Sequence, residues 1–171
     1  VYTFVHDASG LARVELMVAH KAMDDVLRAF RRVRQTAPHA QLVILGEGPE
    51  RRRLERLADA LALRGSVSFR GHLPHSSLVR ELAQAEAMLL LSRKPSERLP
   101  NVVKEAMACG CACVVSDTPG IEELIPSEQY GRVVPAGDVA AAADALLSLL
   151  TDTALCREMG WRARDRVAER F

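Results

Sequence analysis

The sequence has no apolar run long enough to cross a bilayer and almost no net charge. No stretch approaches the roughly 18 consecutive apolar residues that a membrane-spanning helix needs. With 23 basic and 22 acidic residues, the formal net charge is +1, which argues against a nucleic-acid-binding protein. Arginines gather within residues 31–34, 51–53 and 162–166, but each group stands among acids on an expected amphipathic helix. Polar helix faces explain these arginines better than a binding stripe does.

Paired cysteines of the Cys-x2-Cys kind are also missing, although the chain contains four cysteines. Cys109 ends an expected helix, and Cys111 and Cys113 alternate along an expected buried strand, which is unlike a zinc site. We therefore expect no bound metal and interpret these thiols as small buried hydrophobic groups. Together with Cys156 they make four unpaired thiols, which fit a reducing compartment, and we expect a cytoplasmic protein.

Internal repeats, low-complexity tracts and long linkers are absent as well. The sequence opens on Val1 without the basic and then apolar residues of a signal segment, and we expect it to be a fragment of a longer chain. Its 171 residues, 49% of them hydrophobic, are enough for one globular domain with a full core. We expect residues 1–171 to form that single domain.

Strand and helix signals alternate regularly along the chain. Apolar strand signals lie at residues 2–5, 41–45, 67–69, 87–91, 111–116 and 131–134. Helical signals lie at residues 23–33, 54–61, 78–82, 100–109 and 121–124, and two or three helices close the chain. Nearly all-apolar strands separated by helices indicate a parallel sheet covered on both faces, a doubly wound α/β domain. Ligands of such sheets bind at the carboxyl ends of the strands, where the loops bearing Gly46, Gly71 and Glu97 fall.

Residues 96–120 are the most informative stretch, because two acids, Glu97 and Glu105, are separated there by seven residues. Pro100 suits the first position of a short helix, and Gly110 suits the residue that ends it. Glu97 would then precede the helix, and Glu105 would lie on its second turn.

The start of this helix has the chemistry of an anion site. The amides of Asn101 and Val102 would lie at the positive end of the helix dipole, between the two acids. Amides and dipole favour a diphosphate, while the carboxylates accept hydrogen bonds from the hydroxyls of a ribose and of a sugar. The pattern therefore favours a sugar-nucleotide site.

A simpler interpretation of the same acids also holds at this stage. Glu97 would only favour a helix start, and Glu105, with Asn101 and Lys104, would form a solvated helix face opposite buried apolar residues. Isolated acids are usually exposed, so the residues around them must decide between the two interpretations.

Those surrounding residues resemble the donor-binding half of the glycosyl transferases group 1, retaining enzymes of the GT-B fold. In that family a Glu-x7-Glu motif commonly stands in a Gly-aromatic-Pro-Asn-containing segment, followed by a strand and an Asp-x-x-Gly turn. The matching residues are Glu97, Pro100, Asn101, Val102, Val103, Glu105, Ala106, Met107, Ala108, Gly110 and Gly120. Arg98 and Leu99 depart from the family, which usually has glycine and then an aromatic residue there. The departure concerns donor-sugar contacts more than nucleotide contacts, since that glycine lets the backbone approach the sugar.

The segment before the first long helix resembles the family's diphosphate-binding loop. Lys21 and the residues after it match the lysine end of that pattern, which implies that Lys21 binds the diphosphate. The arginine end is displaced, because Leu16 stands at the usual arginine spacing and Arg13 is the nearest arginine. Arg13 is therefore the expected second cation. As an alternative, Lys21 is simply a solvated lysine near a helix start.

Two later loops resemble family segments that lie close to the nucleotide. Gly46 and Gly48 stand in a Gly-x-Gly-Pro turn, although a generic turn before a helix explains them as well. The loop around Gly71 matches the segment whose backbone contacts the nucleobase, with Leu73 as the expected contact. His6, His72 and His75 are interpreted as core or loop histidines rather than catalysts.

The resemblance runs from about Lys21 to Phe171 and implies a function. It implies a Rossmann-like, C-terminal donor-nucleotide-binding half of a retaining, metal-independent glycosyltransferase with no cofactor. Glu97 and Lys21 would act in catalysis. The donor-binding residues would be Glu105, Asn101, Val102, Arg13, Gly46, Gly48 and Leu73.

The partners follow from the same resemblance. The donor would be a nucleotide sugar, and a sugar, lipid or other small acceptor would bind the N-terminal half, which is absent from this chain. Relatives that build lipid-linked glycans or polysaccharides often associate with membranes, so the inner membrane face is the alternative to the open cytoplasm. The isolated segment is expected to be inactive.

Three other functions use similar folds. A nicotinamide dehydrogenase needs a third glycine after Gly46 and Gly48, and Arg51 stands at that position. A sugar-nucleotide epimerase shares the GT-B fold. A non-catalytic interaction domain that kept the fold without the chemistry is the third alternative, favoured by Arg98 and by the displaced arginine.

Overall fold

The computed structural model describes residues 2–7, 22–71, 73–93 and 99–171 of the chain. Its first half contains β1 (Tyr2–Asp7), α1 (Met23–Thr36), β2 (Ala40–Leu45), α2 (Arg51–Ala60), β3 (Val67–Phe69), α3 (His75–Gln84) and β4 (Ala87–Leu90). Its second half contains α4 (Asn101–Ala108), β5 (Ala112–Ser116), α5 (Ile121–Leu124), β6 (Arg132–Val134), α6 (Val139–Thr151) and α7 (Thr153–Arg170).

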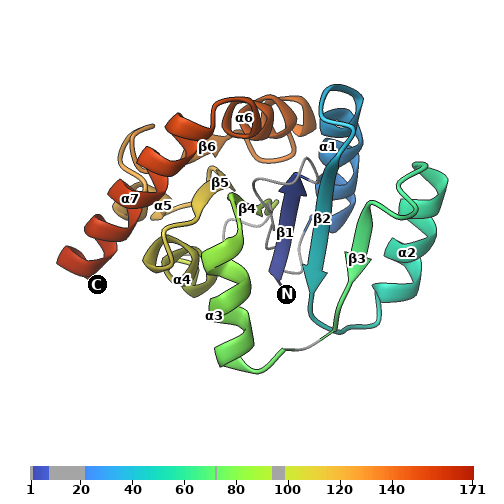
Figure 1. The fold of residues 1–171 in the computed structure, drawn as a ribbon, viewed down its shortest axis with the longest axis horizontal. Helices are drawn as coiled ribbons and strands as arrows, with labels where there is room; N and C mark the ends of the chain where they lie inside the picture. The colour runs from blue at the N-terminus through green and yellow to red at the C-terminus, as the bar shows by residue number, and fades with distance from the viewer. Residues whose placement is uncertain (1, 8–21, 72, 94–98) are drawn as a thin grey trace.

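The strands form one sheet in the order β3-β2-β1-β4-β5-β6. Strands β2 and β3 pair in parallel, as do β4, β5 and β6. Helix α1 packs against α2 and α6, whereas α4 packs against α3 and α7, so helices cover both faces (Figure 1). The α/β architecture with helices on both faces is confirmed.

Strand β1 departs from the predicted all-parallel sheet, because it pairs antiparallel with both β2 and β4. Alternating side chains reveal which residues share a face of a strand, but they carry no information about strand direction. Antiparallel and parallel ladders both satisfy the backbone hydrogen bonds. The sequence of β1 therefore predicts a strand at residues 2–5 without fixing the direction in which it runs.

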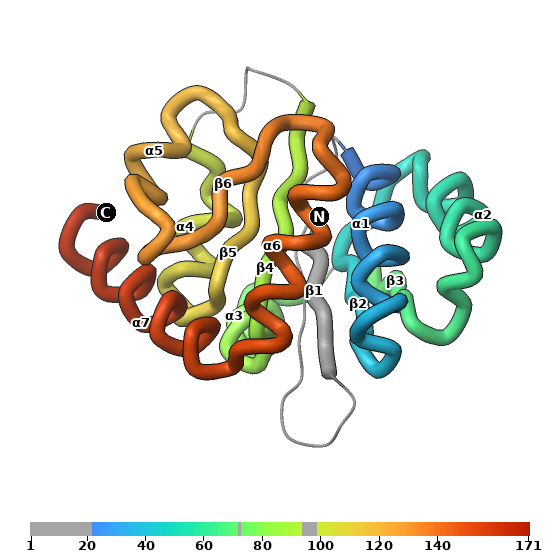
Figure 2. The backbone as a smooth tube through the Cα atoms, turned by 90° about the horizontal axis from the view of Figure 1, so that it is seen from above, coloured from blue at the N-terminus to red at the C-terminus, as the bar shows by residue number. Residues whose placement is uncertain are grey.

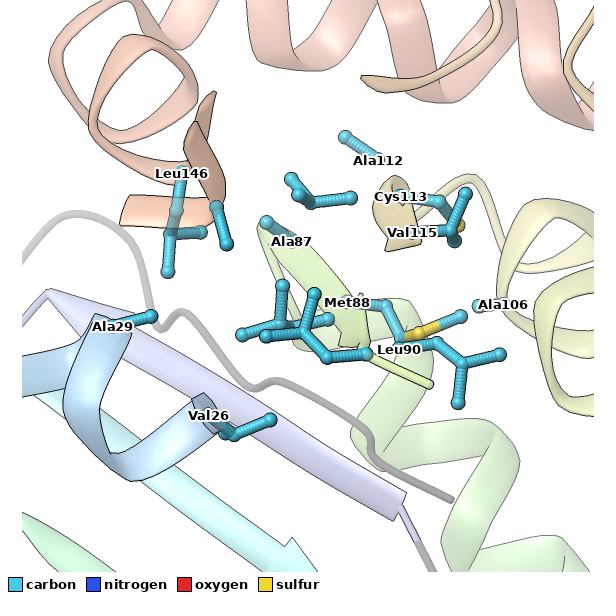
Figure 3. Close-up of a cluster of buried hydrophobic side chains, with 14 of the residues drawn as sticks. Val26, Ala29, Ala87, Met88, Leu90, Ala106, Ala112, Cys113, Val115 and Leu146 are labelled. Atoms are coloured by element: carbon cyan, nitrogen blue, oxygen red, sulfur yellow. The ribbon is translucent and has the colours of Figure 1, made fainter. Parts of the chain in front are cut away.

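The core lies between the central strands and the helices on either side. Every residue of β4 and β5 is buried, as their nearly continuous apolar sequences require. Figure 3 shows side chains of β4 and β5, among them Met88 and Val115, between residues of α1 and α6 on one side and Ala106 of α4 on the other. This two-sided burial fixes β4 at the centre of the sheet.

Two helices close the chain, within the predicted number. Asp152 separates them and caps α7 by accepting a hydrogen bond from the backbone N–H of Leu155. No single helix of the described residues is long and apolar enough to span a membrane. Helices α6 and α7 reach that length and composition only as a pair that bends by 103°.

Candidate functional site

Several helix starts and loops meet at the edge of the sheet where β2, β3 and the strands β4 to β6 end. In a parallel arrangement each connecting helix begins near the carboxyl end of the strand before it. The end of β4, the start of α1 and the turn between β6 and α6 lie on the same, upper side of Figure 2. This edge holds the described residues that the sequence predicts for the site.

The glycine loops after β2 and β3 are joined to each other. Gly46 and Gly71 form an isolated bridge in which the N–H of Gly46 donates to the carbonyl of Gly71 at 2.6 Å. Both glycines have positive φ, 128° and 59°, which favours glycine over other residues. Arg51 reinforces the junction by donating to the Phe69 carbonyl at 2.9 Å and to Glu47 at 2.5 Å.

Gly48 and Leu73 complete these two loops. The carbonyl of Gly48 accepts the N–H of Arg51 at 3.1 Å, which closes the turn into α2. Leu73 is half-buried and packs against the core, so part of its side chain has a structural role. The structure therefore brings Gly46, Gly48 and Leu73 to one edge of the sheet, as predicted.

Helix α4 begins one residue later than expected. Pro100 is the N-cap, with extended backbone angles, rather than the first helical residue. Its carbonyl accepts the N–H groups of Val103 at 3.0 Å and Lys104 at 3.4 Å. Among the residues that the structure describes, no side chain caps this N-terminus with a hydrogen bond, and the amides of Asn101 and Val102 point out of the helix end. Gly110, with φ of 76°, ends the helix as predicted.

Two of the predicted residues of α4, Asn101 and Glu105, share its outward side, whereas Val102 packs against the core. Asn101 is exposed, and Val102 and Glu105 are partly buried, while Val103, Ala106 and Met107 face the core. Asn101 and Glu105 lie one helical turn apart and therefore on the same face. Burial raises the pKa of the Cys109 thiol, and the negative charge of the nearby Glu105 carboxylate raises it further.

The end of β4 leads toward this helix. The buried N–H of Ser92 donates to the hydroxyl of Ser116 at 3.1 Å, which ties the carboxyl ends of β4 and β5 together. Leu99, just before the cap, has φ of 45°, an unfavourable value for a residue with a side chain. Leu99 is one of the two positions that depart from the family pattern. The predicted residues Glu97, Lys21 and Arg13 lie outside the described residues, as do Arg98 and His72.

Sequence reasoning missed an ion pair at the same edge. Asp25, in the first turn of α1, is buried, and both of its carboxylate oxygens accept hydrogen bonds from Arg93. Arg93 follows Ser92 in the loop after β4. Asp25 and Arg93 are 68 positions apart in the chain, so no local pattern reveals their contact. The sequence does indicate that Asp25 is buried, because it lies on the same helix face as Ala22 and Ala29, both of which are buried.

A second ion pair joins the starts of α1 and α2. Arg53 donates to the two oxygens of Asp24 at 2.7 and 2.8 Å. The hydrogen bond from Arg53 lowers the pKa of Asp24. Such bidentate pairs fix orientation as well as charge.

A hollow of about 240 Å³ lies elsewhere on the molecule. It opens between the loop before β6 and helix α7. Its walls are Glu128, Gln129, Arg132, Leu155, Glu158, Met159 and Arg162. The polar wall residues are largely paired, with Arg162 donating to Gln129 at 2.6 Å and to Glu158 at 2.5 Å. None of these residues belongs to the predicted site.

The thiols are buried hydrophobic groups, as predicted for Cys111, Cys113 and Cys156, whereas Cys109 is partly exposed. Burial raises the pKa of the Cys111 and Cys113 thiols and raises that of Cys156 to about 12. Cys156 donates to the backbone carbonyl of Glu86 at 3.1 Å. All four are free cysteines.

Known proteins resemble this chain over most of its length. The family model for glycosyl transferases group 1 matches residues 11–166. N-acetyl-alpha-D-glucosaminyl L-malate synthase of Bacillus anthracis is 36% identical over 169 residues, which cover 95% of this chain and 43% of the relative. The chain thus spans less than half of that relative's length.

Solved structures of related enzymes share the fold. Sucrose-phosphate synthase from Thermosynechococcus elongatus superimposes with a TM-score of 0.76 at 31% identity, over 87% of this chain and 38% of that one. Anabaena HepE, solved with UDP and glucose, gives a TM-score of 0.78 at 21% identity, over 88% of this chain and 41% of that one. On the extent of the family match and the identity to its relatives, this chain belongs to the glycosyl transferases group 1 family.

Proposed function

We propose that this chain is the donor-binding half of a retaining, metal-independent glycosyltransferase, and that it binds a nucleotide-diphosphate sugar. The observation that carries the proposal is helix α4 at the carboxyl edge of the sheet. Its first amides have no side-chain cap among the described residues, and its second turn bears Glu105. Helix N-termini with open N–H groups bind phosphate readily. Membership of the family and the UDP and glucose bound to HepE support the choice of ligand.

The chemistry follows from where charge develops. When the bond between the anomeric carbon and the diphosphate oxygen breaks, negative charge builds on the leaving phosphate and positive charge on the sugar ring. Lys21, Arg13 and the amides of Asn101 and Val102 would meet the phosphate charge. Each such preorganised donor typically lowers the barrier by about 3 kcal/mol.

The two acids would have separate roles. Glu105 would accept hydrogen bonds from the ribose hydroxyls, since it lies one turn inside the helix whose end meets the phosphates. Glu97 would hold the sugar hydroxyls and, being anionic, stabilise the positive charge of the transition state. The acceptor hydroxyl then forms the new glycosidic bond on the anomeric carbon and gives up its proton to the departing diphosphate oxygen.

A non-catalytic interaction domain is the second candidate. Leu99 favours it, because its positive φ marks a sugar-side segment that differs from the family pattern. A domain that kept its core and its helices but lost this segment's contacts would keep the fold and lose transfer.

Titration calorimetry with UDP, GDP and ADP sugars separates the two candidates. The glycosyltransferase proposal predicts saturable binding of at least one of the three, with the matching free nucleoside diphosphate competing for the same site. Absence of binding for all three sugars would contradict the proposal and favour the interaction domain.

A further inference from the structure

Arg93 and Asp25 form an ion pair whose two members differ in exposure. The side chain of Asp25 is 3% exposed, whereas that of Arg93 is 61% exposed. A buried carboxylate is costly unless a cation compensates it, so Asp25 needs Arg93. Arg93 does not need burial, and its guanidinium stays in contact with solvent.

The hydrogen bonds use only one edge of the guanidinium. Nε donates to one oxygen of Asp25 at 2.7 Å, and Nη2 donates to the other. Nη1 makes no hydrogen bond with any residue that the structure describes. Asp25 therefore orients the planar group from one side and leaves donors on the other side for a second anion.

The position of the pair is where a doubly wound sheet binds ligands. Strands β2 and β3 are added on one side of β1, whereas β4, β5 and β6 are added on its other side. The strand order therefore reverses between β1 and β4. Ligands bind outside the carboxyl ends of the strands at such a switch point. Arg93 lies three residues after the end of β4, and Asp25 lies in the first turn of α1, the helix on the opposite side of this point.

The surroundings of Arg93 are loops rather than core. A side chain at Gly137, in the turn between β6 and α6, would come within 3.9 Å of the Arg93 Nε. The pair thus joins the start of α1 to the end of β4, beside this turn. Helix α4, with its open amides, begins eight residues after Arg93 at the same edge.

We propose that Arg93, oriented by the buried carboxylate of Asp25, binds the diphosphate of the nucleotide donor as a cation supplied from β4. The inference rests on the proposed function and names a residue that the family pattern does not assign. Arg93 would supply a cation that the first loop lacks, because Leu16 stands where that loop of the family has its arginine. Asp25 is a positioning residue, since it acts through Arg93.

The test compares ligands that differ only in the number of phosphate groups. The nucleoside diphosphate that the unaltered chain binds best is titrated, together with its monophosphate and its nucleoside, into Arg93→Ala. Hydrogen bonds to charged groups predict a loss of about tenfold or more in diphosphate affinity, with nucleoside affinity unchanged. Arg64→Ala is the matched control, because Arg64 is also an exposed arginine held by an aspartate, Asp59.

Arg93→Ala leaves a buried carboxylate unpaired and therefore destabilises the fold. The double variant Asp25→Asn with Arg93→Gln removes both charges, keeps hydrogen-bonding groups and should lose the same diphosphate affinity at near-normal melting temperature. Unchanged diphosphate affinity in the double variant, or an equal loss of affinity for nucleoside and diphosphate, would overturn this inference but not the proposed function. An unaltered chain that binds no diphosphate would overturn the proposed function and this inference with it.

Discussion

At the scale of single residues, the two acids of the Glu-x7-Glu motif are expected to do different work. Glu105 lies on the outward side of α4, close to the uncapped helix start, which suits a ribose contact. Glu105→Ala should therefore weaken nucleotide binding about tenfold or more. Glu97→Gln should lower the rate of the chemical step more than nucleotide affinity.

Calorimetry and single-turnover transfer by the full-length enzyme measure the two quantities separately. Glu122→Ala is the control, because Glu122 is an exposed acid at the start of another helix. Equal losses of nucleotide affinity in the Glu97 and Glu105 variants would contradict the division of roles.

The buried thiols give the fold a dependence on alkaline pH. Cys111, Cys113 and Cys156 keep their protons in the folded state because burial raises their pKa, whereas an unfolded thiol ionises near pH 8.5. The unfolded state then binds fewer protons, so the free energy of unfolding falls as pH rises above about 9. Each thiol contributes about 1.4 kcal/mol per pH unit.

Urea unfolding at several pH values between 8 and about 11 measures this slope. Cys113→Ala should flatten it by about 1.4 kcal/mol per pH unit, whatever the substitution does to stability at neutral pH. The same slope in the variant and in the unaltered chain would show that folding does not raise the pKa of the Cys113 thiol, which would contradict the expectation.

At the scale of elements, helix α7 docks through a glycine that admits no side chain. A Cβ on Gly160 would lie 2.0 Å from the carbonyl oxygen of Gly110, in the turn between α4 and β5. Helix propensity alone predicts that Gly160→Ala stabilises the protein by up to about 1 kcal/mol. The clash with backbone predicts the opposite sign, a loss of about 1–3 kcal/mol.

Chemical denaturation of Gly160→Ala decides between the two signs. Ala168→Gly, on an exposed position of the same helix, gives the propensity effect without the contact. A more stable Gly160→Ala variant would mean that α7 does not pack this closely against Gly110.

The elements themselves were largely predictable from sequence. The helix at α4, the strand at Val67–Phe69 and the short helix at Ile121–Leu124 follow from local apolar periodicity, proline and glycine, which act within a few residues. The prediction of a parallel sheet missed the antiparallel pairing of β1, because the direction of pairing depends on distant strands. The contact between Asp25 and Arg93 was missed for the same reason, since it joins residues far apart in sequence.

The candidate site was predictable in part. The loops that bear Gly46, Gly48 and Leu73 lie on one edge of the sheet. Asn101 and Val102 lie in the first turn of α4 and Glu105 in its second, as predicted. The roles of all these residues in binding stay predictions, as do those of Glu97, Lys21 and Arg13, which lie outside the described part of the chain.

At the scale of the whole molecule, the chain corresponds to 43% of its Bacillus anthracis relative. A GT-B enzyme acts in a cleft between two domains, and the proposed acceptor half is not part of this sequence. The isolated chain should therefore bind nucleotide weakly and transfer sugar at least about a hundredfold more slowly than a full-length enzyme, because the acceptor is not held in place. Product formation assayed with both proteins measures the ratio, and comparable rates would contradict this expectation.

The proposed function depends on a nucleoside diphosphate binding the N-terminal amides of α4. A titration of ¹⁵N-labelled chain with UDP, GDP or ADP, followed by amide NMR shifts, tests the location directly. We expect the largest shifts at Asn101, Val102, Gly46 and Gly71, with none in the hollow lined by Glu128 and Arg162. Shifts confined to that hollow, with α4 unmoved, would contradict this expectation.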